Sequence, residues 1–179
     1  MNDLSPLRLW VMRLAFVLLA LVNLFFHLLP LETTPRSWAS PDLLLGFALA
    51  WSMRRPEYVP AISLTLVFLL TDLLLQRPPG LWALLALVAC ENLKSRSRSI
   101  RDATFGAEWI AVATRLIAIM LGYRIVLGLT LVAPPPWQLS LIETGMTILF
   151  YPLIVVTTHA LMGVRKAAPG ELDALGQRA

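Results

Sequence analysis

The chain has 179 residues, of which 58% are hydrophobic and 15% charged, and its formal net charge is +4. A soluble domain of this size carries about 25% charged residues, and the apolar residues here are grouped into long blocks, so the composition predicts a membrane protein. The basic residues stand in short segments between the blocks and form no aromatic-interleaved basic surface, which argues against nucleic-acid binding.

Six apolar blocks follow one another along the chain. A transmembrane helix needs roughly 20 apolar residues, within a range of about 17 to 25. Four blocks meet this requirement plainly: 9–29, 58–76, 107–132 and 138–164. Two shorter blocks, 37–53 and 80–93, lie at or below the lower limit and are compatible with short spans, tilted spans or re-entrant segments.

The basic residues decide between these alternatives, because each crossing moves the next loop to the other side and cytoplasmic loops carry the excess of Lys and Arg. With six crossings, most basic residues outside the blocks fall on one side: Arg8, Arg54, Arg55, Lys94, Arg96, Arg98, Arg101, Arg165, Lys166 and Arg178. The other side keeps only Arg36 and Arg77. The sequence therefore predicts an all-α polytopic membrane protein with six spans, two of them short, and both termini in the cytoplasm.

The connections between the blocks are too short to form a water-soluble domain. We predict a single six-span membrane domain at 1–166 and a short cytoplasmic tail at 167–179. The first block is expected to be a signal anchor, because its apolar core is too long for a cleaved signal peptide. Every tryptophan falls near the end of a predicted span, where indole side chains favour the headgroup boundary.

Enzymatic and metal-binding motifs are absent from the sequence. There is no Gly-rich phosphate loop, no HExxH and no GxSxG. Cys90 lies inside an apolar block and is expected to pack there. His27 and His159 each stand alone, whereas a metal site needs several convergent donors. We therefore expect no enzymatic activity and no cofactor.

Ionisable side chains inside the blocks point to functional or structural partners, because each costs about 2.5 to 3.5 kcal/mol to insert into hydrocarbon. Asp72, Arg124 and Glu143 are expected at similar depths in the outer half of the membrane, given the helical rise of about 1.5 Å per residue. We predict that Arg124 pairs with Glu143 or with Asp72.

Arg115 lies nearer the cytoplasmic end of the fifth span, with Glu91 and Glu108 near the same boundary. Its long side chain could extend to the inner headgroups. A salt bridge between the fourth and fifth spans is the alternative, and the sequence does not favour either.

The segment TDLLLQRPPG gives a reason for an acidic residue at the end of the third span. Its prolines lack an N–H and disfavour a helical residue before them, so the span must end there, and the glycine permits a tight reversal. The Asp72 carboxylate can then accept hydrogen bonds from the turn, or pair with Arg77 or Arg124. The predicted outer contact residues are Asp72, Arg77, Pro78, Pro79 and Gly80.

A basic, serine-spaced loop follows the fourth block. Solvation near anionic lipid headgroups explains such a loop, and a docking surface for a cytoplasmic partner is the alternative. Either interpretation concerns the same basic residues: Lys94, Arg96, Arg98 and Arg101.

The segment TDLLLQRPPG and the start of the next span form a predicted outer hairpin. With this hairpin and its span layout, the chain resembles the MreD family of rod shape-determining membrane proteins. An acid near the end of span three, a turn and a glycine eight positions after the acid form the family signature, which Asp72 and Gly80 match. The likeness covers most of the chain, including its size and the basic loop after span four. Two positions depart from it: the glycines that many members carry four residues before and after the acid are Phe68 and Gln76 here.

The resemblance implies a non-enzymatic scaffold in the bacterial inner membrane. Its partners would be MreC, the MreB filament, the glycosyltransferase RodA and its penicillin-binding transpeptidase, with membrane lipid around the spans. MreD-like proteins also resemble the six-helix S-components of vitamin transporters. Small-molecule binding or transport is therefore the alternative function, although fold likeness alone does not transfer an activity.

Overall fold

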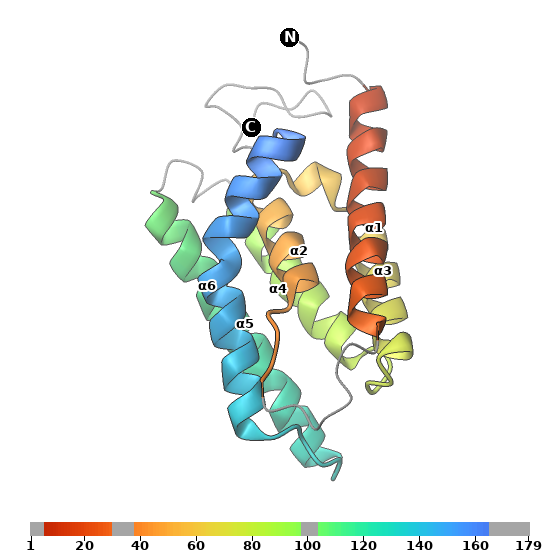
Figure 1. Ribbon diagram of the computed structural model, residues 1–179, viewed down its shortest axis with the longest axis vertical. Helices are drawn as coiled ribbons and strands as arrows, with labels where there is room; N and C mark the ends of the chain where they lie inside the picture. The colour runs from red at the N-terminus through yellow and green to blue at the C-terminus, as the bar shows by residue number, and fades with distance from the viewer. Residues whose placement is uncertain (1–5, 30–37, 98–103, 165–179) are drawn as a thin grey trace.

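The structure is a computed structural model that describes residues 6–29, 38–97 and 104–164. Within these ranges all regular secondary structure is helical, which confirms the predicted all-α class (Figure 1). The predicted tail at 167–179, together with Arg98 and Arg101 of the inner loop, lies outside the described residues. The helices are α1 (Pro6–Leu28), α2 (Leu43–Arg54), the 3-10 helix η1 (Pro56–Tyr58), α3 (Ala61–Leu74), α4 (Leu81–Ser97), α5 (Phe105–Leu129) and α6 (Trp137–Met162).

Among the residues that the structure describes, three helices, α1, α5 and α6, are long and apolar enough to cross a membrane. α2 has 12 residues and α3 has 14, or about 18 and 21 Å of helix at 1.5 Å per residue. The sequence predicted a full-length helix at 58–76, and this expectation is wrong in length. The chain enters α3 through η1 and the extended Pro60, and the outer hairpin ends the helix at Leu74. The membrane crossing of the shorter helices stays a prediction.

Consecutive α-helices run in opposite directions, so the first residues of α1 and the last of α6 lie at the same end of the bundle (Figure 1). α2 is the central helix and packs against α1, α4, α5 and α6. At Gly46 it approaches α6 so closely that an added Cβ would lie 2.5 Å from the Cδ1 atom of Ile154. Because other helices surround α2, most of its side chains are buried.

The core is centred on Trp51, which has no exposed surface. Its ring lies 5.7 Å from Phe16 of α1 and 6.2 Å from Tyr58 of η1, measured between ring centroids. Trp51 lies in the last turn of α2, near the end of its helix as predicted, but its ring faces the core because α1 and η1 cover this turn. Its position relative to a headgroup boundary stays a prediction.

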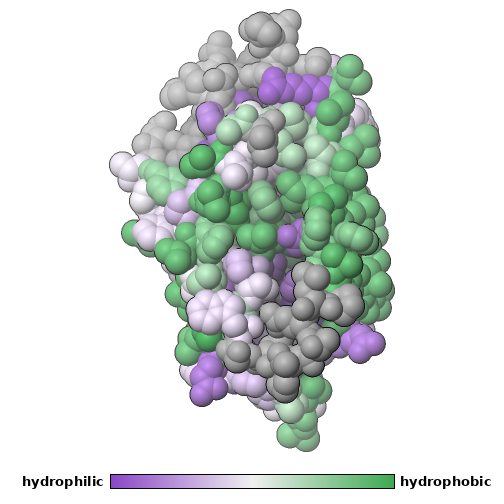
Figure 2. All heavy atoms as spheres, in the orientation of Figure 1, coloured by the Kyte–Doolittle hydropathy of each residue, from purple (hydrophilic) through white to green (hydrophobic). Residues whose placement is uncertain are grey.

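The outer surface of α1 is apolar, with Leu14, Leu18 and Phe25 among its exposed side chains. Figure 2 shows hydrophobic residues covering the α1 side of this face, while strongly hydrophilic residues lie mainly toward the two ends. This distribution is the one that a helical bundle in lipid requires, because the hydrocarbon core offers no partner for exposed polar groups.

Candidate functional site

The end of α3 is closed by a Schellman motif. The N–H of Arg77 donates to the carbonyl of Asp72 at 2.9 Å, and the N–H of Gln76 donates to the carbonyl of Leu73 at 3.4 Å. Gln76 has a φ of 54°, a left-handed conformation that is unfavourable for residues with a side chain. One of the two positions at which this chain departs from the MreD signature is thus a position whose backbone favours glycine.

The Asp72 carboxylate caps the N-terminus of α4. Its side chain has no exposed surface, and its Oδ2 accepts hydrogen bonds from the N–H groups of Gly80 at 3.0 Å and Ala83 at 3.2 Å. Gly80 is the N-cap residue, because its carbonyl accepts the N–H of Leu84 at 2.9 Å. The negative charge therefore lies at the positive end of the helix dipole, where it also satisfies two N–H groups.

This geometry decides between the two roles predicted for Asp72. Hydrogen bonding to the turn is confirmed, whereas no ion pair joins Asp72 to Arg77 or Arg124 in the described part of the chain. The guanidinium carbon of Arg77 instead lies 4.8 Å from the centroid of the Trp82 ring. Trp82 packs edge-on against Tyr123 at 5.2 Å, and this stack connects the hairpin to α5.

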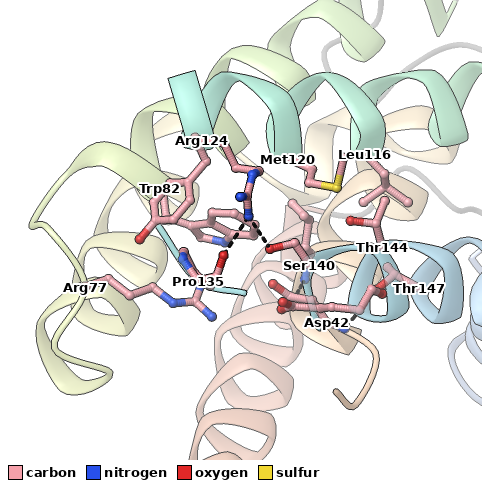
Figure 3. Close-up of a pocket in the computed structure, with 13 residues that line it drawn as sticks. Asp42, Arg77, Trp82, Leu116, Met120, Arg124, Pro135, Ser140, Thr144 and Thr147 are labelled. Carbon is pink, nitrogen blue, oxygen red and sulfur yellow. Dashed lines mark hydrogen bonds between the residues drawn. The ribbon is translucent and has the colours of Figure 1, made fainter. Parts of the chain in front are cut away.

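Arg124 closes the turn between α5 and α6. Its Nη1 donates to the carbonyl of Pro135 at 2.7 Å and to the hydroxyl of Ser140 at 3.2 Å, and its guanidinium carbon lies 4.4 Å from the Trp137 ring centroid. These hydrogen bonds are drawn in Figure 3. The predicted pairing with an acidic residue is therefore wrong for Arg124, because the turn itself supplies a carbonyl, a hydroxyl and an aromatic face.

A cavity of about 140 Å³ lies beneath the α3–α4 and α5–α6 turns, and α2, α4, α5 and α6 contribute to its lining. Arg77 and Arg124 approach it from one side and Asp42 from the other (Figure 3); Glu143 also lines it. Tyr123, Ser140, Thr144 and Thr147 add hydroxyl groups to the lining. The cavity thus brings opposite charges together, and within the described part of the chain neither Arg77 nor Arg124 forms an ion pair with an acid.

Asp42 also fixes the start of the central helix. Its Oδ1 accepts the N–H of Leu45 at 2.9 Å and so caps α2. Its own N–H donates to the Thr147 hydroxyl at 2.9 Å, and that hydroxyl donates to the carbonyl of Glu143 at 2.7 Å. The first residues of α2 are thereby attached to α6, which holds one wall of the cavity in place.

A second buried carboxylate, Glu108, lies at the opposite end of the bundle. It forms a two-pronged ion pair with Arg54 of α2, at 2.8 and 3.2 Å, and its Oε1 accepts the Tyr151 hydroxyl of α6 at 2.8 Å. Arg54, Glu108 and Tyr151, which we call the Glu108 group, join α2, α5 and α6. Sequence reasoning missed this group, since it treated Arg54 as a loop residue and Glu108 only as a neighbour of Arg115.

Arg115 does not form the salt bridge that was one of its two predicted roles. It donates to the side-chain oxygen of Asn92 at 2.9 Å and to the carbonyl of Ala111 at 3.0 Å, while Glu91 pairs with Lys94 at 2.7 Å. The link between α4 and α5 therefore uses a neutral amide. The contact with Ala111 directs the side chain toward the start of α5, as the headgroup alternative requires.

The chemistry of these sites is that of helix capping and ion pairing. Among the described residues, no group of three or more His, Cys, Asp or Glu could hold a metal ion, and Cys90 is a buried free thiol. No family model matches the chain, and neither does a characterised protein or a solved structure.

Proposed function

We propose that the protein is a non-enzymatic, MreD-like scaffold of the cell-elongation machinery in a bacterial inner membrane. The observation that supports this best is the 3.0 Å hydrogen bond from the N–H of Gly80 to Asp72. It gives the eight-residue spacing a physical purpose, because the acid caps the helix that the glycine begins. Gly80 has a φ of +85°, which only glycine adopts freely.

The scaffold would use contact surfaces at the two ends of the bundle. The outer surface is the hairpin at 68–82, whose Pro79 is exposed, and the inner surface begins at the basic end of α4 with Lys94 and Arg96. Helices in lipid associate by close packing and interhelical hydrogen bonds, and the apolar face of α1 offers further area. By its resemblance, the chain would link MreB inside with MreC, RodA and the transpeptidase.

Depletion in a rod-shaped host tests the function. We expect cells without the protein to lose their width control and become round, and a plasmid copy to restore the rod. If depleted cells keep their width and form, the scaffold proposal fails.

Site-specific photocrosslinking tests the contact surface. A crosslinker at Pro79 should capture MreC, RodA or the transpeptidase, whereas one at Leu131 should not. Leu131 is 95% exposed on the other outer turn and serves as the matched control. Equal capture from both positions would mean that the hairpin has no special role.

The cavity favours small-molecule binding as a second candidate function. Its charges of both signs and its hydroxyl groups suit a small zwitterion, but its volume of about 140 Å³ is below the roughly 300 to 1,000 Å³ of pockets for drug-sized ligands. A vitamin would therefore need the helices to move apart. A copurifying ligand identified by mass spectrometry, and lost in Ser140→Trp, would favour this function over the scaffold.

A further inference from the structure

The groove between α4 and α5 changes from apolar to cationic along its length. Its volume is about 420 Å³. Along α4 the lining runs from Leu85 and Val88 to Arg96, at the spacing of one helix face. α5 is antiparallel and contributes Ala118 beside the apolar part and Arg115 beside the polar part. Where α4 and α5 approach closely, a Cβ added to Gly122 would lie 3.3 Å from Leu85.

The cationic end has two guanidinium groups without a carboxylate partner. Arg115 is bound by neutral oxygens, those of Asn92 and Ala111. Arg96 is exposed, and within the described ranges neither arginine forms an ion pair. The acid nearest on α4, Glu91, is paired with Lys94. The groove end therefore carries net positive charge that an external anion can neutralise.

The groove has the length of one lipid leaflet. From Leu85 to Arg96, α4 rises about 16 Å at 1.5 Å per residue, and half of a bilayer's hydrocarbon core is about 15 Å. Val88, in the middle of this stretch, is 59% exposed, so an acyl chain can enter from the side. Basic pockets between membrane helices on the cytoplasmic side suit anionic headgroups.

We propose that this groove binds one anionic diacyl phospholipid of the inner leaflet. The phosphate lies between Arg96 and Arg115, and one acyl chain lies along Val88 and Ala118. The proposal requires insertion in a membrane with the basic end inward, but it does not depend on the scaffold function. Among the described residues, the side chains of α4 and α5 are linked at this end by the hydrogen bond from the Arg115 guanidinium to the amide oxygen of Asn92, and a lipid held here would add a second link between the two helices.

Native mass spectrometry of the full chain in mild detergent tests the site. We expect one phosphatidylglycerol per chain to survive purification, and added phosphatidylglycerol to raise the melting temperature more than phosphatidylcholine does. Arg96→Gln should lower phosphatidylglycerol affinity about fivefold, since each basic residue near the surface contributes about 1 kcal/mol. Ala118→Trp should abolish retention by filling the groove.

Two matched variants control for charge and bulk. Arg8→Gln removes a basic residue at the same end of the bundle, and Ala107→Trp adds the same bulk at an exposed position of α5 outside the groove; both should retain the lipid. Equal stabilisation by the two lipids overturns the proposal, and so does normal retention in Ala118→Trp. Capture of a protein helix by a crosslinker at Val88, with no lipid retained, would likewise overturn it.

Discussion

Asp72 and Glu108 are carboxylates without exposed surface at opposite ends of the same bundle, yet they are stabilised by different kinds of partner. Asp72 accepts hydrogen bonds from backbone N–H groups 8 and 11 residues further along the chain. Glu108 is bound by the side chains of Arg54 and Tyr151, at sequence separations of 54 and 43. The first arrangement closes a local turn, and the second holds three helices together.

This difference determines what each carboxylate requires. Backbone N–H groups are neutral donors, so an uncharged oxygen at position 72 can still accept from them. The Arg54 guanidinium is a charge with a side-chain exposure of only 11%, so it needs a negative partner. Removing one member of a buried ion pair leaves the other uncompensated, which costs more than the pair itself contributes.

The largest expected effect is that of Glu108→Ala. It should lower the free energy of unfolding by about 3 to 5 kcal/mol, because Arg54 is left without its partner inside the bundle. Thermal or detergent-induced unfolding of the purified protein measures the change.

The matched control is the double variant Arg54→Met with Glu108→Leu. Replacing both charges by apolar groups is often neutral, so the double variant should be more stable than Glu108→Ala alone. If the double variant is the less stable of the two, the ion pair is not the source of the effect.

Asp72→Ala should have the second largest effect. It should lower the free energy of unfolding by about 2 kcal/mol, because the α4 N-terminus then lacks its cap. Asp72→Asn should cost less than Asp72→Ala, since the amide oxygen still accepts the N–H groups of Gly80 and Ala83, while the charge at the helix dipole is lost and the amide NH2 takes the place of the unpartnered Oδ1. The amount of folded protein in membranes, compared by immunoblot, measures both. Wild-type levels for both variants would mean that the carboxylate has no structural role.

Tyr151→Phe isolates the neutral part of the Glu108 group. It removes one hydrogen bond to a carboxylate that keeps its ion pair with Arg54, so a loss of about 1.5 kcal/mol is expected. Thr157→Val on the same helix is the control, because its hydroxyl donates only to a carbonyl of its own helix. Equal losses for the two variants would place the Tyr151 hydroxyl outside the stabilising group.

The hairpin could be predicted because its signals are local. Prolines, a glycine and an acid within ten residues determine where α3 ends and which N–H groups need an acceptor. The Glu108 group could not be predicted in this way, because its formation depends on how α2, α5 and α6 are rotated about their axes, and packing around the central helix sets those rotations. The acidic partner predicted for Arg124 is wrong, because a sequence does not reveal which backbone carbonyl a turn will present.

The smallest expected effect, and the only stabilising one, is that of Gln76→Gly. The φ of 54° at Gln76 costs a residue with a side chain about 1 to 2 kcal/mol, and glycine removes this cost. Glycine also has greater freedom in the unfolded chain, which lowers the free energy of unfolding by about 0.5 to 1 kcal/mol and offsets part of the gain. The net gain should be about 0.5 kcal/mol, measurable as a raised melting temperature. Leu75→Gly is the control, because the φ of −87° at Leu75 suits any residue, so glycine there should destabilise. A gain from both substitutions would show that the hairpin favours flexibility and that left-handed strain at Gln76 is not the cause.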